Sequence, residues 1–306
     1  MGTFAARIRA AARPDGSHGP ADRLVRALDA VGEADELDVF TGPVRRAVKA
    51  LPLGPVRDVL HGRPLGHPLH PALVHVSLGA WVSAAVLDLA GGSERQARLL
   101  VGFGTVAAAP TAWSGWVDWA EQHDPQLRTG LVHAASMATA AGLYGTSWAA
   151  RSLGRHSLGR ALGFAGLAVA GAGAAVGGHV AHRQAAVANK AEPVPYAVGP
   201  GWHPLGPLDG IPVGEPCRRT AGEVPVVVVR EPGGAVHVLA DRCSHRSGPL
   251  SDGTVADGCL RCPWHGSTFR LSDGWNVRGP ATAPQPRFDT RTDQDGTLYA
   301  RLPQAD

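Results

Sequence analysis

The sequence predicts a multidomain protein in which an all-α bundle of four transmembrane helices precedes a C-terminal all-β domain. Four stretches between residues 71 and 180 contain no Asp, Glu, Lys or Arg and consist mainly of Ala, Gly, Leu and Val. Strand-type runs separated by Gly-containing turns follow in the last third of the chain. A chain of 306 residues has room for about two domains. We expect a basic, partly helical or disordered segment at 1–60, the four-span domain at 61–185, a Pro/Gly linker at 186–197 and the β-domain at 198–306.

The four uncharged stretches are the predicted membrane spans. Each approaches the roughly 20 residues that a helix rising 1.5 Å per residue needs to cross a bilayer. A helix of a soluble protein normally carries a charged face, whereas these stretches carry none. Frequent small residues allow close helix packing in membranes, although a soluble Ala-rich bundle is the alternative. The predicted spans are residues 71–87, 99–117, 129–150 and 161–180, and Trp116, Trp119 and Trp148 lie near their ends.

Two β-hairpins are predicted in the C-terminal third. Residues 226–230 and 235–240 are rich in strand-forming side chains and are joined through Pro232-Gly233-Gly234. Residues 287–292 and 297–302 are joined in the same way through Asp295-Gly296. The segment therefore predicts a small antiparallel β-domain.

Two short motifs in this domain combine two thiols with two imidazoles. They read Cys243-Ser244-His245 and Cys262-Pro263-Trp264-His265, with sixteen residues between them. Turn-forming residues predict that both motifs lie in loops: Gly248, Pro249, Pro263 and Gly266. A Cys2His2 zinc site would use the same ligands, but zinc fingers place their histidine pair on a helix. The motifs therefore favour a metal centre held between two loops.

This pair of motifs resembles the Rieske signature, and the resemblance covers residues 198–304. It implies a [2Fe-2S] cluster in which Cys243 and Cys262 bind one iron while His245 and His265 bind the other. Two neutral imidazoles make the cluster less negative, which raises its potential to roughly −150 to +300 mV, from about −400 mV with four cysteines. The resemblance also implies supporting roles beside the ligands for Ser267, Gly248 and Pro263.

The sequence departs from the high-potential Rieske proteins at three positions. Gly248 and Trp264 stand where respiratory members carry cysteines, so the disulfide between the loops cannot form. Its absence suits a reducing compartment. Phe269 replaces a tyrosine that donates a hydrogen bond in high-potential members, which predicts a potential in the lower or middle part of the range. The remaining cysteines, Cys217 and Cys259, are expected to be structural thiols.

The membrane segment resembles an uncharacterised bacterial family known as domain of unknown function 2231, over residues 60–185. The resemblance rests on the segment from His67 to His75, on Asp118 and on the Leu131-Val132-His133-Ala134 start of the third span. If successive spans alternate in direction, His75, His133 and His179 share one membrane face, each about 5 to 6 Å inside a span end. These histidines are expected either to bind haem b or a second metal, or to line a polar rim.

Loop charges and composition give the expected location. Basic residues moderately favour the side that holds the N-terminus, which predicts a multi-pass protein of the cell inner membrane with a cytoplasmic Rieske domain. No apolar run of a cleaved signal follows the first residue. The net charge of +3 is small and spread, so nucleic acid is not an expected partner.

The sequence thus predicts a membrane-anchored Rieske iron–sulfur protein that transfers single electrons at the cytoplasmic membrane face. Its expected partners are membrane lipids and a redox protein or quinone. The alternatives are a ferredoxin-like component of an oxygenase or reductase system, and a redox- or metal-sensing membrane protein. No catalytic residue is identified, and the 41 residues after His265 are too few for an oxygenase domain.

Overall fold

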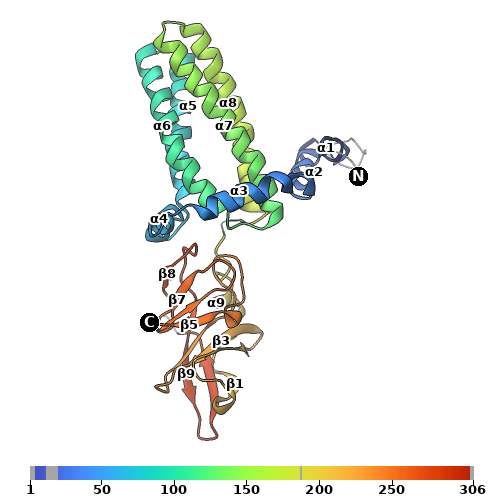
Figure 1. Cartoon of the computed structure of the whole chain (residues 1–306), viewed down its shortest axis with the longest axis vertical. Coiled ribbons are helices and arrows are strands. Elements are labelled where there is room, and N and C mark those ends of the chain that lie inside the picture. The colour runs from blue at the N-terminus through green and yellow to red at the C-terminus, as the bar shows by residue number, and fades with distance from the viewer. Residues whose placement is uncertain (1–3, 12–19, 187, 304–306) are drawn as a thin grey trace. The chain divides into compact units, whose positions relative to one another are not determined.

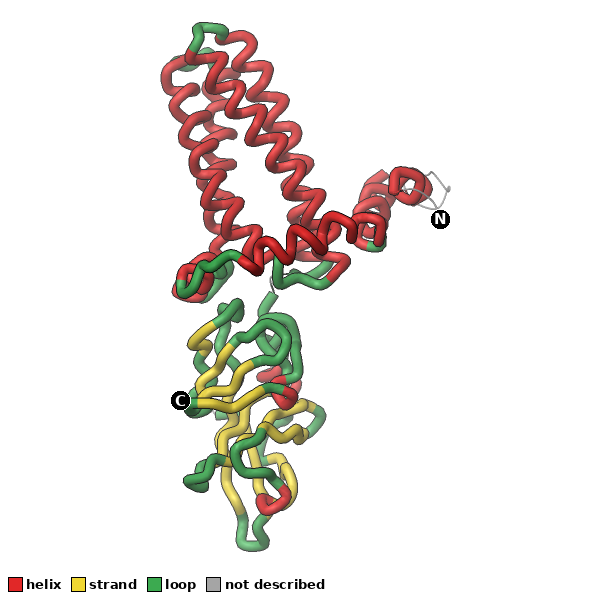
Figure 2. The backbone as a smooth tube through the Cα atoms, in the orientation of Figure 1, coloured by secondary structure: helices red, strands yellow, loops and turns green. Residues whose placement is uncertain are grey.

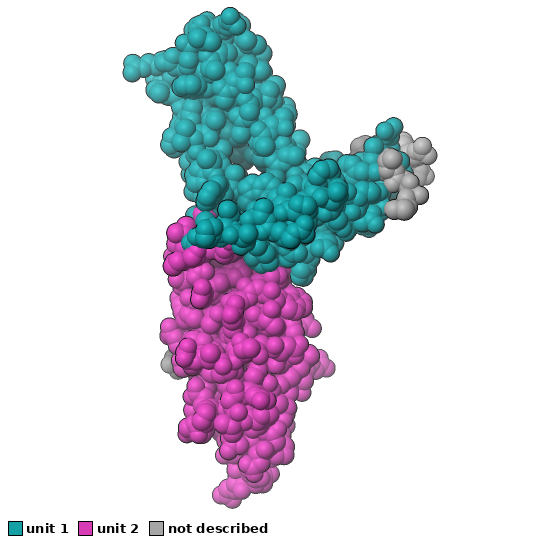
Figure 3. Space-filling view, viewed as in Figure 1, with its two compact units in different colours: residues 1–53, 69–187 teal, residues 54–68, 188–306 magenta. Residues whose placement is uncertain are grey.

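The computed structural model describes residues 4–11, 20–186 and 188–303, and it divides into two compact units. One unit joins Met1–Leu53 to Leu69–Val187, and the other joins Gly54–Pro68 to Ala188–Asp306 (Figure 3). Helices dominate the first unit and strands the second (Figure 2). The segment Gly54–Pro68 belongs to the β-rich unit.

Four long helices form the first unit, as the sequence predicts. They run side by side in Figure 1 and are α5 (Leu69–Leu89), α6 (Glu94–Trp119), α7 (Asp124–Ser152) and α8 (His156–Gly178). Short connections make consecutive helices antiparallel neighbours. Gly91 and Gly154 adopt positive φ angles of 69° and 75° in two of these turns. Gln126 closes a capping box with His123 at the start of α7.

Two of the described helices are long and apolar enough to cross a membrane. They are α5, with 21 residues, and the 28-residue segment His156–Arg183, and each has a mean hydropathy of 1.6. Membrane crossing by α6 and α7 stays a prediction. Arg151 is buried at the end of α7, where its guanidinium donates two hydrogen bonds to Asp88.

An aromatic pair fills the middle of this bundle. The rings of Trp81 and Tyr144 stack with their centres 4.2 Å apart. A methyl group added at Gly104 would lie 2.7 Å from the Trp81 ring, and one at Gly166 would lie 3.0 Å from the Tyr144 ring. Small residues therefore provide the space for two large buried side chains.

The N-terminal helices attach to one end of the bundle. They are α1 (Phe4–Ala11), α2 (Pro20–Gly32) and α3 (Asp38–Ala50), with a 3-10 turn, η1, at Asp35–Leu37. Asp29 of α2 accepts two hydrogen bonds from Arg183 at 2.7 Å. Arg128 of α7 binds both Asp38 carboxylate oxygens, at 2.8 and 2.6 Å. The segment 1–60, expected to be partly helical, thus contains α1, α2 and α3.

The second unit is an antiparallel β-domain with two sheets. A six-stranded sheet has the order β1-β10-β9-β4-β3-β2, and a four-stranded sheet has the order β5-β6-β7-β8. The strands are β1 (His203–Pro207), β2 (Pro216–Ala221), β3 (Val224–Arg230), β4 (Val236–Ala240), β5 (Thr254–Ala256), β6 (Cys259–Arg261), β7 (Thr268–Arg270), β8 (Asn276–Arg278), β9 (Arg287–Thr292) and β10 (Thr297–Arg301). Short helical segments complete the unit: α4 (Val56–Leu60), η2 (Arg63–Leu65), α9 (Val194–Ala197), η4 (Leu208–Gly210) and η5 (Leu250–Asp252).

Both predicted hairpins are confirmed. In the first, Val226 pairs with Ala240 and Arg230 with Val236. In the second, Leu298 of β10 pairs with Thr292 of β9. One apolar core cluster packs β3 and β4 against β9 and β10, and a second surrounds the two motif cysteines.

Candidate functional site

Two loops carry the motifs, and they share one backbone conformation. The first follows β4, and the second joins β6 to β7. In each loop, the cysteine N–H donates to the carbonyl five residues later, from Cys243 to Gly248 at 2.9 Å and from Cys262 to Ser267 at 2.8 Å. The paired hydrogen bonds close both loops in the same way, so each presents its cysteine similarly, whereas the histidine follows the cysteine by two residues in the first loop and by three in the second.

A left-handed residue closes each loop. Ser247 has a φ angle of 62° and donates its N–H to the Cys243 carbonyl. Gly266 occupies the same place in the second loop, with a φ angle of 72° and an N–H that donates to the Cys262 carbonyl. Glycine adopts this conformation without cost, whereas serine does not. The first loop therefore carries local strain that the second avoids.

The four predicted ligands lie together, with sulfur inside and nitrogen outside. Cys243 and Cys262 are 1% and 2% exposed, whereas His245 and His265 are half-buried. The imidazole rings are perpendicular, with centres 5.1 Å apart. Two imidazoles bound to one tetrahedral metal by bonds of about 2.0 Å have ring centres about 5 Å apart. The residues therefore fit a centre with a thiolate end in the core and an imidazole end toward the surface.

Hydrogen bonding favours a thiolate at one of the two motif cysteines, Cys262. A hydrogen bond from Cys243 lowers the pKa of Cys262 to about 7, although burial opposes the shift. The same bond, together with burial, raises the pKa of Cys243 well above its usual value. Backbone N–H groups of Trp264 and His265 also bind the Cys262 sulfur. Such donors stabilise negative charge on sulfur, as a thiolate ligand requires.

Gly248 allows the two loops to meet. A methyl group at this position would lie 3.0 Å from the Cys262 sulfur and 3.0 Å from the Trp264 ring. Any side chain would displace one of these neighbours, so the predicted supporting role of Gly248 has a steric basis. Pro263, beside Trp264, is exposed and forms part of the rim.

Gln285 fixes the first loop, a role that the sequence did not indicate. Its side-chain amide donates to the carbonyls of Ala240 and Arg242 at 2.7 and 2.6 Å, and its oxygen accepts the Ser244 N–H at 3.0 Å. Gln285 is 1% exposed. It follows a loop rich in Pro and Ala, so periodicity offers no signal for its burial.

A third loop, between β8 and β9, packs against the second motif. The Ala281 N–H donates to the Ser267 hydroxyl at 3.1 Å, and the Ala281 carbonyl accepts from Asn276 at 2.9 Å. The Gly279 N–H donates to the Asp58 carboxylate at 3.1 Å, which ties the Gly54–Pro68 segment to this loop. Ser267 is fully buried beside the motif cysteines, where the sequence predicted a hydrogen-bond donor.

Comparison with known proteins assigns the β-domain. Residues 201–289 match the Rieske [2Fe-2S] domain. The ferredoxin subunit of anthranilate 1,2-dioxygenase from Burkholderia cepacia is 40% identical over 83 residues, which are 27% of this chain and 76% of that protein. The chain belongs to the Rieske [2Fe-2S] proteins. This family match replaces the zinc alternative with a [2Fe-2S] cluster.

Other matches relate the Rieske domain to ferredoxins. The 3-phenylpropionate/cinnamic acid dioxygenase ferredoxin subunit of Escherichia coli (strain K12) is 31% identical over 100 residues, which are 32% of this chain and 92% of that protein. A solved complex of reduced oxygenase and oxidized ferredoxin in carbazole 1,9a-dioxygenase contains a chain whose sequence is 26% identical to this one. The match covers 32% of this chain and 91% of that chain, with a TM-score of 0.30. The sequence matches to the two curated ferredoxin subunits relate the Rieske domain to oxygenase ferredoxin subunits.

The helical unit also has a family assignment. Residues 66–189 match a predicted membrane protein family, DUF2231. The expected convergence of helix ends is present, because the start of α5, the end of α6, the start of α7 and the end of α8 line one cavity of about 440 Å³. Predicted haem or metal residues His75 and His133 line this cavity, as does Asp118.

The three predicted histidines lie in different surroundings. His133 faces His70, whose ring centre lies 6.2 Å away. His75 is exposed and donates to the carbonyl of Pro71 in its own helix. His179 lies in the π-helical turn η3 (His179–Arg183), and its Nε2 lies 3.3 Å from an Asp29 oxygen. The structure therefore pairs His133 with His70, a residue that the sequence did not include in this group.

The other cysteines lie outside the ligand set. Cys217 of β2 accepts a hydrogen bond from Arg219 at 2.7 Å. Cys259 of β6 pairs with Arg270 of β7. Both are free thiols, and their structural role stays a prediction.

Proposed function

We propose that this chain is a membrane-anchored Rieske ferredoxin that delivers single electrons to an oxygenase or reductase component. When bound, a [2Fe-2S] cluster accepts and releases one electron at a time. Cys243 and Cys262 would hold its buried iron, and His245 and His265 its outer iron. The observation that carries the proposal is the ordered burial of this set, with both sulfurs in the core and both imidazoles at the surface.

The outer end of the site is suited to contact with a partner. Trp264 is 49% exposed beside the half-buried His265, with the ring centres 6.3 Å apart. Exposed aromatic residues are common at protein interfaces. The relationship to oxygenase ferredoxin subunits supports an oxygenase-type protein partner over a quinone. We place the domain on the cytoplasmic face of the inner membrane, on the basis of the loop charges.

The half-buried imidazoles also support proton-coupled electron transfer. Each ring has a second nitrogen outside the metal bond, where it can hold a proton. Solvent reaches His245 and His265, so this proton can exchange with water. We expect the potential to fall as pH rises through the range in which the rings lose these protons. A potential that stays constant between about pH 6 and 10 would exclude the coupling in that range.

The test uses the full chain purified from membranes in mild detergent. We expect iron and sulfide in equal amounts, a Rieske-type EPR signal after reduction, and reoxidation by an oxygenase component. Cys262→Ser and His265→Ala should lose the signal. The Cys217→Ser/Cys259→Ser variant is the matched control and should retain it. A cluster that survives loss of Cys262, or that cannot be reduced and reoxidised, would contradict the proposal.

A further inference from the structure

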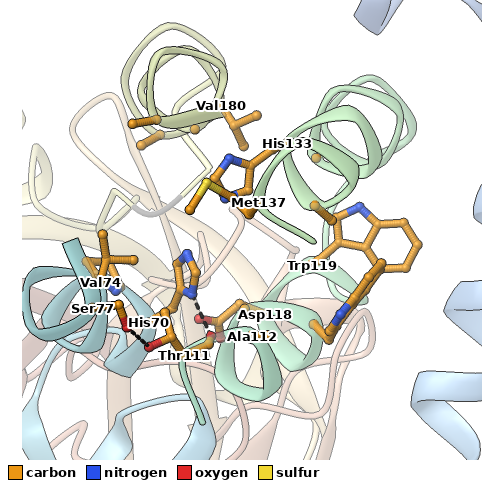
Figure 4. Close-up of a pocket in the computed structure, with 18 of the residues that line it drawn as sticks. His70, Val74, Ser77, Thr111, Ala112, Asp118, Trp119, His133, Met137 and Val180 are labelled. Atoms are coloured by element: carbon orange, nitrogen blue, oxygen red, sulfur yellow. Dashed lines mark hydrogen bonds between the residues drawn. The ribbon is translucent and has the colours of Figure 1, made fainter. Parts of the chain in front are cut away.

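The helical unit contains a second pair of facing imidazoles, in the cavity of about 440 Å³ between its helices. His70 comes from α5 and His133 from α7. Figure 4 shows the two rings pointing toward one another across the cavity, with Met137 beside His133. Their centres are 6.2 Å apart and their planes are perpendicular. The proposed electron-transfer function makes no use of this pair.

Hydrogen bonds fix the tautomer of both rings. His70 Nδ1 binds the carbonyl of Thr111 at 2.8 Å, and His133 Nδ1 binds the carbonyl of Gly173 at 2.8 Å. A carbonyl oxygen only accepts, so Nδ1 carries the proton in both rings. Nε2 is therefore the lone-pair nitrogen of each neutral imidazole. A histidine that binds a metal is commonly oriented in this way, by a backbone carbonyl on its other nitrogen.

Two glycines let the rings lie flat against neighbouring helices. A methyl group at Gly115 would lie 2.8 Å from the His70 ring. One at Gly177 would lie 2.9 Å from the His133 ring. Each histidine is thus held within its own helical hairpin, His70 by α6 and His133 by α8. The site is built from both hairpins, with one imidazole from each.

The separation of the rings distinguishes between kinds of metal site. Two metal–nitrogen bonds of about 2.0 Å on opposite sides of one metal place the ring centres about 6 Å apart, whereas tetrahedral bonds place them at about 5 Å. The Rieske pair His245 and His265, at 5.1 Å, matches the second value. The pair His70 and His133, at 6.2 Å, matches the first. The membrane pair therefore has the spacing of two axial ligands on opposite sides of one metal.

We infer that His70 and His133 are the axial ligands of a haem iron. A porphyrin supplies four nitrogen ligands, so two imidazoles complete the iron, whereas a structural zinc ion needs about four protein ligands. The cavity has the size of a cofactor site, since such sites span about 300 to 1,000 Å³. Its walls are mainly apolar and include Trp81, Met137 and Trp119. Apolar walls suit the faces of a porphyrin.

The test measures haem binding directly, in a full-length Cys243→Ser background that removes the cluster's own absorption. The protein is produced with added iron and haem precursor, purified in mild detergent, and titrated with haemin. We expect one haem per chain, with the visible and EPR spectra of a six-coordinate, low-spin iron. This readout does not depend on the Rieske cluster, so its failure is distinguishable from failure of the proposed function.

Substitutions identify the ligands. His70→Ala and His133→Ala should each abolish the low-spin spectrum, whereas His75→Ala, which also lines the cavity, should retain it. Gly177→Ala should weaken haem binding by about 10- to 100-fold by displacing His133. Gly171→Ala on the same helix is its matched control, because nothing lies within 4 Å of the added methyl group.

Two results would overturn the inference. One is a wild-type spectrum in both His70→Ala and His133→Ala. The other is a purified chain that binds no haem, including one that carries copper or zinc at this pair instead. Where an alanine variant fails to fold, His133→Met keeps a ligand atom and is expected to give an altered low-spin spectrum. Helical circular dichroism in the same detergent checks the fold of every variant.

Discussion

The Ser267 hydroxyl accepts a hydrogen bond from the Ala281 backbone N–H at 3.1 Å, and this contact orients a buried donor beside the motif cysteines. Because the oxygen accepts from Ala281, its own hydrogen can be donated to cluster sulfur. Such a bond stabilises the more negative reduced state. If this hydrogen bond is stronger by about 1 to 2 kcal/mol in the reduced state than in the oxidised state, it raises the one-electron reduction potential by about 40 to 90 mV.

Ser267→Ala should therefore lower the reduction potential by about 40 to 90 mV without loss of the cluster. The measurement is a redox titration of the full chain followed by EPR. Ser272→Ala, an exposed serine in the same domain, is the control and should leave the potential unchanged. An equal potential in Ser267→Ala and wild type would show that the hydroxyl does not reach the cluster.

The missing disulfide between the loops can be restored. The space for a Cβ atom at Gly248 lies 3.0 Å from Trp264 Cγ, which is one bond from its own Cβ. The two Cβ positions are thus within about 4.5 Å, as a disulfide requires. Gly248→Cys/Trp264→Cys should form this bridge on oxidation, detected as two fewer alkylatable thiols. Trp264→Cys alone is the control. Thiols that stay reactive in the oxidised double variant would disprove the proximity.

A buried ion pair should contribute strongly to the stability of the bundle. The side chains of Arg151 and Asp88 are 0% and 4% exposed and form two hydrogen bonds. Removal of Asp88 leaves the buried Arg151 guanidinium with Glu94 at 3.5 Å as its remaining acidic neighbour, so the cost is at most that of a broken buried pair, about 3 to 5 kcal/mol. Asp88→Ala should therefore lower the thermal unfolding midpoint clearly in detergent. Arg155→Ala, at an exposed arginine in the adjoining loop, should change it little. Equal midpoints for the two variants would contradict the assignment.

Attachment of α3 to the bundle should weaken in acid. Hydrogen bonds from Arg128 hold the pKa of Asp38 below its usual value of 3.8. A carboxyl group with a lowered folded-state pKa adds stability above its unfolded-state value, and that stability is lost as pH falls through the folded-state pKa. The Asp38 side chain is 47% exposed, so the gain is at most about 1 kcal/mol.

The stability difference between wild type and Asp38→Asn should thus be constant at neutral pH, begin to fall near the usual carboxyl pKa of 3.8, and vanish once the pH is below the lowered folded-state pKa. Thermal unfolding followed by circular dichroism, at a series of pH values, measures this difference. A difference that persists unchanged in strong acid would indicate a contact that does not depend on the Asp38 charge.

Local sequence patterns predicted much of the architecture. Uncharged apolar runs identified α5 to α8, because a helix in an apolar medium needs no charged face. Turn residues such as Asp295-Gly296 located the hairpins, because few residues adopt the required backbone conformations. The placement of Gln285 could not be predicted in this way, because its three hydrogen bonds join segments far apart in the chain.

For the histidines of the helical unit, too, the sequence predicted one part of the arrangement and packing decided the other. The alternating direction of the helices predicted which helix ends lie together, so His75, His133 and His179 were expected on one membrane face. The choice of His70 over His75 as the partner of His133 depends on which face of α5 meets the cavity. That face is set by packing against α6, where Gly115 leaves room for the His70 ring. Spacing along one helix does not contain this information.

The sequence by itself determined the ligand types, their grouping into two loops and the absence of a bridging disulfide, because these depend on residue identity and local turn chemistry. Tertiary structure alone decided that both sulfurs are buried while both imidazoles reach the surface. It also decided that Ala281 orients Ser267, and that His70 faces His133 at 6.2 Å. These relationships arise between segments distant in sequence, where side-chain packing and hydrogen bonding set the geometry.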